Sequence, residues 1–256
     1  MRISVLTFDH EPYGLKLLNL LRRSEISVEQ VVVCSDVWGS RVRWLRRIAK
    51  RLGWAGALAY LAWRVRSRTF SKEATWRGHR LERDYRQLAN RIDYTPTPRS
   101  TATPEALERA RPALCLLGDC GIVPPAVLAV PSIATLNAHP GILPEYRGLD
   151  TALWAVYENQ MDKVGCTLHV VDPGIDTGGI LEIRPYTWQG DETIDLLARR
   201  LSETCLTMLV EACRAEWPAY LDRARPQGEG RQFSVMPMRR WFQVERRLAR
   251  LAKRSR

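Results

Sequence analysis

Short apolar runs alternate with segments of helical periodicity along most of this chain, and this alternation restricts the fold more than any other feature. Strands are expected at Ile3–Phe8, Val28–Cys34, Ile92–Tyr94, Ala113–Leu117, Ile133–Leu136, Val164–Val171 and Ile180–Tyr186. Helices are expected at Tyr13–Arg23, Thr103–Arg111, Asp150–Glu158 and Glu192–Trp217. Such alternation predicts an α/β fold, namely a Rossmann-like, largely parallel twisted sheet flanked by helices.

The net charge of +11 is concentrated in two segments. Arg41–Arg68 has nine basic residues and no acidic one, and Arg239–Arg256 has eight basic residues and one acidic one. The first lies in a basic, Trp-rich helical insert at about residues 38–91 of an expected catalytic domain, 1–216, and the second in a short C-terminal extension, 217–256. The insert is expected to form solvated amphipathic helices, with an RNA or membrane-surface contact, or a lid over an anionic substrate, as alternatives.

Several functional classes are disfavoured by the sequence. Neither G-x-G-x-x-G after the first strand nor G-x-x-x-x-G-K-[ST] occurs, which disfavours the common nucleotide-binding fingerprints. The six cysteines form no C-x-x-C pair, so neither a metal site nor a disulfide framework is expected. The membrane-like stretch Gly53–Trp63 is too short to span a bilayer, and the N-terminus lacks a signal-peptide pattern. A cytoplasmic location is therefore expected.

Polar side chains of three kinds are expected to meet near one edge of the sheet. Asn137 and His139 follow a strand expected to end at Leu136, and their spacing of two directs both side chains the same way. Asp176 lies in the polar turn after the strand that ends at Val171. An amide donor, an imidazole and a carboxylate suit acyl transfer, because donors stabilise an oxyanion and a base removes a proton. No Ser or Cys stands beside them as a nucleophile, which favours direct attack by a substrate amine.

The two blocks N-A-H-P-G-I-L-P-E-Y-R-G (137–148) and I-D-T-G-G-I-L (175–181) together resemble the formyltransferase family that uses 10-formyltetrahydrofolate. The resemblance covers about residues 1–216. It implies that Asn137, His139 and Asp176 are the catalytic set and that 10-formyltetrahydrofolate is the co-substrate, with no metal. Asn137 and His139 are then expected to stabilise the oxyanion, and Asp176 to accept the proton of the attacking amine.

The chain departs from this family's pattern in two places. The residue after the His-Pro pair is often Ser and is Gly141 here. The segment L-G-D-C-G-I-V-P (117–124) resembles the one whose backbone edges the pterin, but Asp119, Cys120 and Gly121 replace its usual aromatic or Met and Arg side chains. The resemblance implies pterin contacts from two segments. They are Cys120, Gly121, Ile122 and Val123 on one side, and the loop beginning at Asp172 on the other.

The acceptor is expected to be a small amine, most simply an amino sugar on a nucleotide diphosphate. The first loop, with Asp9 and Glu11, would repel a small phosphate ester, and no tRNA-recognising domain is evident after Trp217. A formyltetrahydrofolate hydrolase or another small-amine formyltransferase remains an alternative, as does a basic RNA- or membrane-binding protein on the same scaffold. No nucleic-acid partner and no transmembrane segment are expected, and a homodimer is left open.

Overall fold

The structure is a computed structural model that describes residues 1–9, 11–35, 75–76 and 78–254, with Arg46, Ala49–Lys50, Gly53–Trp54 and Leu58 between them. Most of the predicted insert, including most of Arg41–Arg68, lies outside the described residues.

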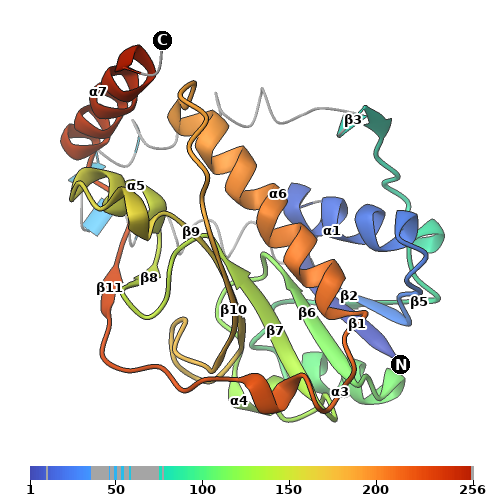
Figure 1. Cartoon of the computed structure of the whole chain (residues 1–256). Helices are drawn as coiled ribbons and strands as arrows, with labels where there is room; N and C mark the ends of the chain where they lie inside the picture. The colour runs from blue at the N-terminus through green and yellow to red at the C-terminus, as the bar shows by residue number, and fades with distance from the viewer. Residues whose placement is uncertain are drawn as a thin grey trace.

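Within the described residues, a seven-stranded sheet of order β10-β9-β7-β6-β1-β2-β5 forms the centre of the molecule (Figure 1). Its strands are β1 (Ile3–Phe8), β2 (Gln30–Cys34), β5 (Arg91–Thr95), β6 (Leu114–Gly118), β7 (Ala134–His139), β9 (Gly165–Val170) and β10 (Ile180–Pro185). Neighbouring strands from β5 to β7 are parallel, whereas β9 runs antiparallel to both β7 and β10. The expected Rossmann-like, largely parallel fold is confirmed.

Helices cover both faces of this sheet (Figure 1). The long helices are α1 (Pro12–Arg23), α3 (Ala102–Ala110), α6 (Ile194–Ala212) and α7 (Met238–Arg254), and the short ones are α4 (Pro125–Leu128) and α5 (Thr151–Tyr157). α1 and α6 pack together on one face, α3 and α4 lie on the other, and α7 packs against α5. The described residues also form small elements, namely β3 (Thr75–Trp76), β4 (His79–Arg80), β8 (Tyr146–Gly148), β11 (Arg231–Phe233) and the 3-10 turns Tyr85–Gln87, Met161–Lys163 and Leu221–Arg223.

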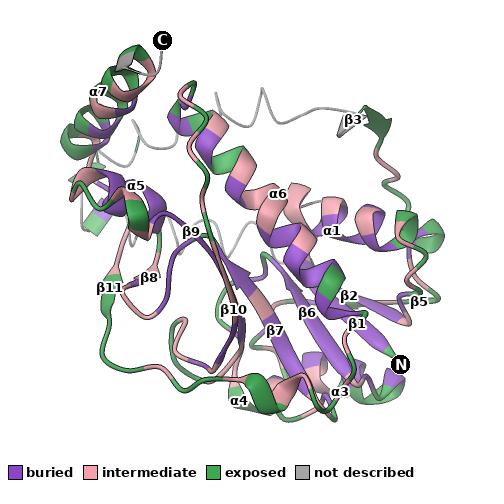
Figure 2. Ribbon diagram, in the orientation of Figure 1, coloured by how far each residue is buried: buried purple, intermediate pink, exposed green. Residues whose placement is uncertain are grey.

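Two apolar clusters hold these layers together. The larger one joins the sheet to α1 and α6, and the smaller one joins the sheet to α3 and α4. The helical period explains the first contact, since Leu15, Leu18 and Leu21 share the buried side of α1. The central strands are buried on both faces, as Figure 2 shows, which accounts for their apolar sequences.

Two predicted boundaries were wrong by three residues or more. β7 continues past Leu136 to His139, because its backbone stays paired with β9 as far as Thr167. α6 ends at Ala212 rather than at Trp217, and the chain then turns. Pro218 disfavours helical geometry at Trp217, the residue before it, which argues against a helix that includes Trp217.

All six cysteines are buried free thiols. Among the described helices, none has both the length and the hydropathy that a membrane-spanning segment requires.

Candidate active site

The last residues of β7 carry Asn137 and His139 on the same face of the sheet, the face on which α3 and α4 pack. The antiparallel pairing with β9 then sets their neighbours. Asn137 lies opposite His169, and His139 lies opposite Thr167. The pairing therefore adds a second imidazole and a hydroxyl to the two side chains predicted from the sequence.

The imidazole of His139 is buried and held in one protonation pattern. Its Nε2 lies 2.9 Å from the Tyr146 carbonyl oxygen. Because a carbonyl only accepts, Nε2 must donate its proton there, and Nδ1 of the neutral ring is left as an acceptor. Burial lowers the pKa of His139 below its ordinary value, and the nearby Asp176 carboxylate partly opposes this effect.

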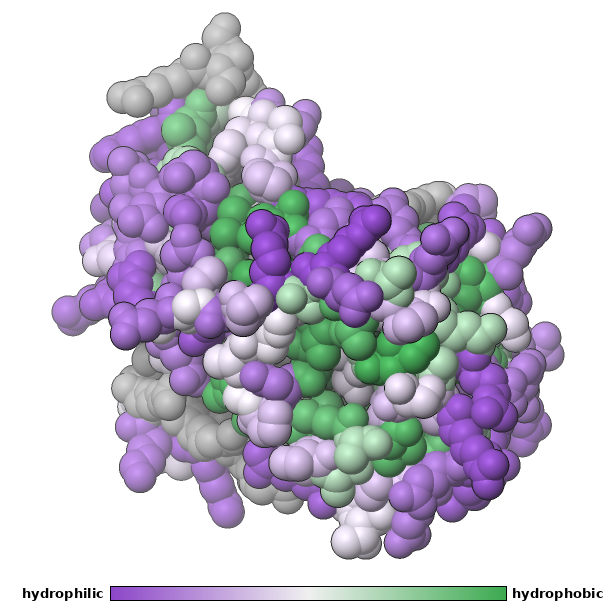
Figure 3. All heavy atoms as spheres, turned by 60° about the horizontal axis from the view of Figure 1, so that its bottom comes forward, coloured by the Kyte–Doolittle hydropathy of each residue, from purple (hydrophilic) through white to green (hydrophobic). Residues whose placement is uncertain are grey.

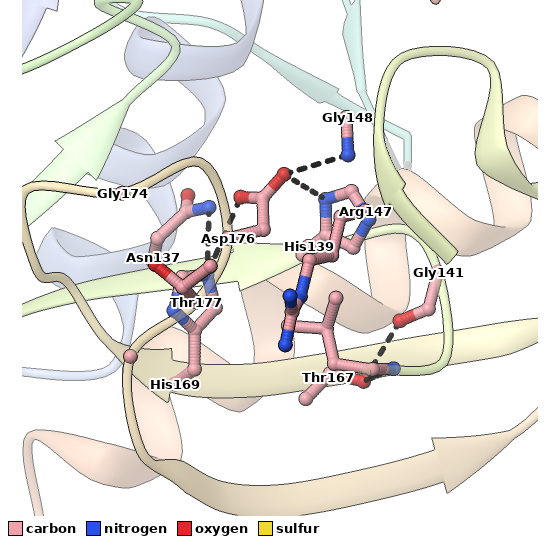
Figure 4. A network of polar contacts seen from close by, with 12 residues as sticks. Asn137, His139, Gly141, Arg147, Gly148, Thr167, His169, Gly174, Asp176 and Thr177 are labelled. Atoms are coloured by element: carbon pink, nitrogen blue, oxygen red, sulfur yellow. Dashed lines mark hydrogen bonds and ion pairs between the residues drawn. The ribbon is translucent and has the colours of Figure 1, made fainter. Parts of the chain in front are cut away.

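Asp176 lies between the two imidazoles (Figure 4). One carboxylate oxygen is 3.5 Å from His139 Nδ1 and accepts a hydrogen bond of 2.9 Å from the Gly148 N–H. The other is 3.6 Å from His169 Nε2. Burial alone would raise the pKa of Asp176, but His169, His139 and the Gly148 N–H outweigh it and hold the pKa at about 2.

His169 was not singled out from the sequence. Its Nδ1 donates to the Val170 carbonyl oxygen at 2.9 Å, and the Asn137 amide nitrogen donates to its Nε2 at 3.2 Å. The side chain is only 2% exposed. A polar residue inside the apolar strand Gly165–Val170 was the available signal, but which strand would pair with it could not be read from spacing.

The loop after β7 is fastened to β9 beneath the imidazoles. The Thr167 hydroxyl donates to the Gly141 carbonyl oxygen at 2.7 Å and accepts from the Leu143 N–H at 3.2 Å. Gly141 must lack a side chain in this arrangement, since a Cβ there would lie 2.7 Å from His139 Nε2. The turn thereby fixes where the ring of His139 lies.

The two segments expected to contact a pterin leave few side chains exposed. Cys120 and Val123 are buried in the smaller apolar cluster, while Gly121 and Ile122 are exposed. Asp172 directs its carboxylate into its own turn, where it accepts from the Gly174 N–H and the Thr177 hydroxyl. Figure 3 shows hydrophobic side chains gathered at the centre of the lower face, with hydrophilic ones around them.

A family model described as "Formyl transferase" matches residues 62–213. The chain is similar to methionyl-tRNA formyltransferases of Syntrophus aciditrophicus (strain SB), 33% identical over 111 residues, and of Synechococcus sp. (strain JA-3-3Ab), 37% identical over 90 residues. These matches span 43% and 35% of this chain but only 35% and 28% of the relatives, so the matched part is about a third of their length.

Solved structures with the same fold cover much more of the chain. Glycinamide ribonucleotide transformylase 1 from Symbiobacterium toebii gives a TM-score of 0.55 at 23% identity, covering 90% of this chain and 92% of that one. A sugar N-formyltransferase from Shewanella sp FDAARGOS_354 gives 0.54 at 12% identity, covering 97% and 88%. At these identities the likeness concerns the fold.

Proposed function

The chain belongs to the formyl transferase family, and from that premise we propose that it transfers a formyl group from 10-formyltetrahydrofolate to the primary amine of a small acceptor. Members of this family use formyltetrahydrofolate as the formyl donor. The observation that carries the proposal is the Asp176 carboxylate, which lies within 3.6 Å of two imidazole nitrogens that both lack a proton in the neutral rings. Such a cluster is ready to accept one proton.

His139 is the group best suited to take that proton. A carboxylate whose pKa is about 2 holds a proton much more weakly than an imidazole does, so Asp176 is a poor base at neutral pH. Protonation at His139 Nδ1 would instead convert the 3.5 Å contact with Asp176 into an ion pair. This division of roles revises the expectation that Asp176 itself accepts the proton.

Asn137 is the proposed oxyanion donor. One N–H of its amide is directed at His169, and the amide group carries a second N–H. His139 contributes to the oxyanion only after it gains a proton, because its one N–H in the neutral state already donates to Tyr146. Asn137 therefore acts from the first step and His139 from the second.

The transfer balances with these groups alone. The neutral amine of the acceptor forms a bond to the formyl carbon, and the carbonyl electron pair moves to the oxygen beside Asn137. The amine proton passes to His139 Nδ1. When the bond from carbon to N10 breaks, N10 keeps the electron pair and receives the proton back from the imidazolium, which releases tetrahydrofolate and the formamide.

The pterin of the donor is proposed to lie between the Cys120–Val123 segment and the Asp172–Asp176 loop. Because Cys120 and Val123 are buried, that segment would offer the backbone and the exposed Ile122 rather than a row of side chains. A non-hydrolysable folate analogue should raise the melting temperature, since a ligand specific to the native state stabilises it. No shift at saturating analogue would count against this site.

An amino sugar carried on a nucleotide diphosphate is the acceptor that we propose. A helix N-terminus commonly holds a phosphate. The N-terminus of α1 has Glu11 at its N-cap and Asp9 close by, which disfavours a small phosphate ester there. Exposed arginines of α7, such as Arg246 and Arg250, could meet a diphosphate.

The decisive experiment incubates the enzyme with 10-formyltetrahydrofolate and a panel of amines, and measures tetrahydrofolate release. The panel contains nucleotide-linked amino sugars, glycinamide ribonucleotide, methionyl-tRNA and simple amines. Fast release with a nucleotide-linked sugar supports the proposal. Release without any acceptor supports a hydrolase, preference for another amine overturns the acceptor, and no release in any arm overturns the activity.

A further inference from the structure

A segment from the C-terminal part of the chain lies directly against the candidate active site. We call this segment, residues 225–236, the strap. Arg225 forms a two-bond bridge with Ile180 at the start of β10, at 2.8 and 2.9 Å. β11 then pairs in parallel with β8, which places the two segments side by side (Figure 1). The strap therefore touches both the end of the loop that carries Asp176 and the strand that carries Gly148.

Gln227 is the residue through which the strap reaches the loop. Its side-chain amide donates to the carbonyl oxygens of Asp176 at 3.1 Å and Gly178 at 2.6 Å. Its side-chain oxygen accepts two hydrogen bonds from the Arg147 guanidinium, at 3.2 and 3.0 Å. Arg147 also donates to the Gly228 carbonyl oxygen at 2.9 Å. The amide of Gln227 is thus fixed from both ends.

β8 also contacts Asp176, through the backbone of Gly148. Gly148 has a positive φ of 97° and its N–H donates to the Asp176 carboxylate. A Cβ at Gly148 would lie 2.2 Å from the Phe233 carbonyl oxygen, so β11 packs directly on this residue. Asp176 itself has a φ of 51°, a left-handed conformation that a non-glycine residue keeps only where its surroundings enforce it.

We propose that Gln227, held by Arg147, is a positioning residue that keeps the Asp176 carboxylate against His139, so that the C-terminal strap completes the active site. The inference deepens the proposed function and rests on it for its kinetic consequence. It also assigns a task to part of the segment predicted as a separate extension at residues 217–256. The strap acts through two carbonyl contacts on the loop, so its loss should move Asp176 without removing any group that reacts.

The test compares Gln227→Ala and Gln227→Glu with the control Gln232→Ala. Gln227→Glu keeps the size of the side chain and can still pair with Arg147, but it has no N–H for the two loop carbonyls. Gln232 lies on β11 of the same strap, and its side chain is exposed. Melting temperatures show whether each variant is folded.

The first readout is kinetic. Both Gln227 variants should lower kcat by about tenfold and raise KM for the folate by a smaller factor, because Asp176 acts in the transition state while only one of the two segments proposed to contact the pterin moves. Gln232→Ala should have the kcat and KM of the wild-type protein. Equal kcat in all variants would overturn the inference, as would a loss confined to KM.

The second readout does not depend on activity. The imidazole signal of His139 is titrated by NMR and is assigned by its absence in His139→Gln. Asp176 raises the pKa of this ring, while burial and His169 lower it. Retreat of Asp176 should therefore shift the pKa of His139 further down, by about half a unit or more, in the Gln227 variants only. An unchanged titration would overturn the inference, whereas a shifted titration in a protein that formylates no amine would overturn the proposed function alone.

Discussion

Replacing Gly141 by Ala tests whether the turn after β7 sets the position of His139. The new Cβ would lie 2.7 Å from His139 Nε2, 2.7 Å from Thr151 Oγ1 and 2.8 Å from the Tyr146 carbonyl oxygen. Ordinary contacts at a Cβ begin near 3.4 Å, so all three neighbours must move. Overpacking of this kind costs about 1–3 kcal/mol. Loss of the hydrogen bond between His139 and Tyr146 adds about 1 kcal/mol. We therefore expect a destabilisation of about 2–4 kcal/mol.

Activity should fall as well, by at least about tenfold in kcat, because the ring that we propose as the proton acceptor leaves its alignment with Asp176. Urea unfolding at constant m measures the first effect, and steady-state kinetics with the best acceptor measures the second. Gly228→Ala is the matched control, since a Cβ at Gly228 meets nothing within 4 Å. The family pattern often has Ser at the position of Gly141. If Gly141→Ala stays within about 0.5 kcal/mol of the wild-type unfolding free energy and within twofold of its kcat, the steric reasoning is refuted.

Three further predictions follow from the same geometry. His139→Ala and Asp176→Ala should each lower kcat by at least about 10²-fold in folded protein, as loss of a base or of its charge partner does, and wild-type turnover in either would contradict the assigned roles. Stability should fall in acid: the depressed pKa of Asp176, about 2, adds stability above pH 3.8 that is lost as pH falls through about 2. Conversion of that shift gives about 2 kcal/mol. The lowered pKa of His139 adds a loss that begins below 6.5, because the unfolded ring gains its proton first. Urea midpoints across this pH range measure both, and an unchanged acid slope in Asp176→Asn would argue against the first. Thr167→Val should destabilise by about 1–3 kcal/mol, since it leaves the Gly141 carbonyl and the Leu143 N–H without the hydroxyl between them. A neutral result would mean that the turn is fixed by other contacts.

The sequence by itself determined the layout of the fold and part of the candidate site. Hydrophobic periodicity is a local property, so strands such as Ile3–Phe8 and helices such as Pro12–Arg23 could be placed from the residues within them. Asn137 and His139 were likewise predictable, because a spacing of two on one strand puts both side chains on one face. Asp176 required the resemblance of a whole block, since a single Asp in a Gly-rich turn is most often a turn former.

Only the tertiary structure decided what each of these groups contacts. His169 meets Asn137 because β9 pairs antiparallel with β7, and Gln227 reaches Asp176 from 51 positions along the chain. The position of the proton on the neutral His139 ring follows from the Tyr146 carbonyl oxygen. The turn after β7 brings this oxygen within 2.9 Å of Nε2. Contacts between residues far apart in sequence leave no periodic trace, because periodicity records only which side of an element is buried. The proton acceptor that we propose thus depended on packing, while the kind of chemistry that we propose was already indicated by the order of the residues.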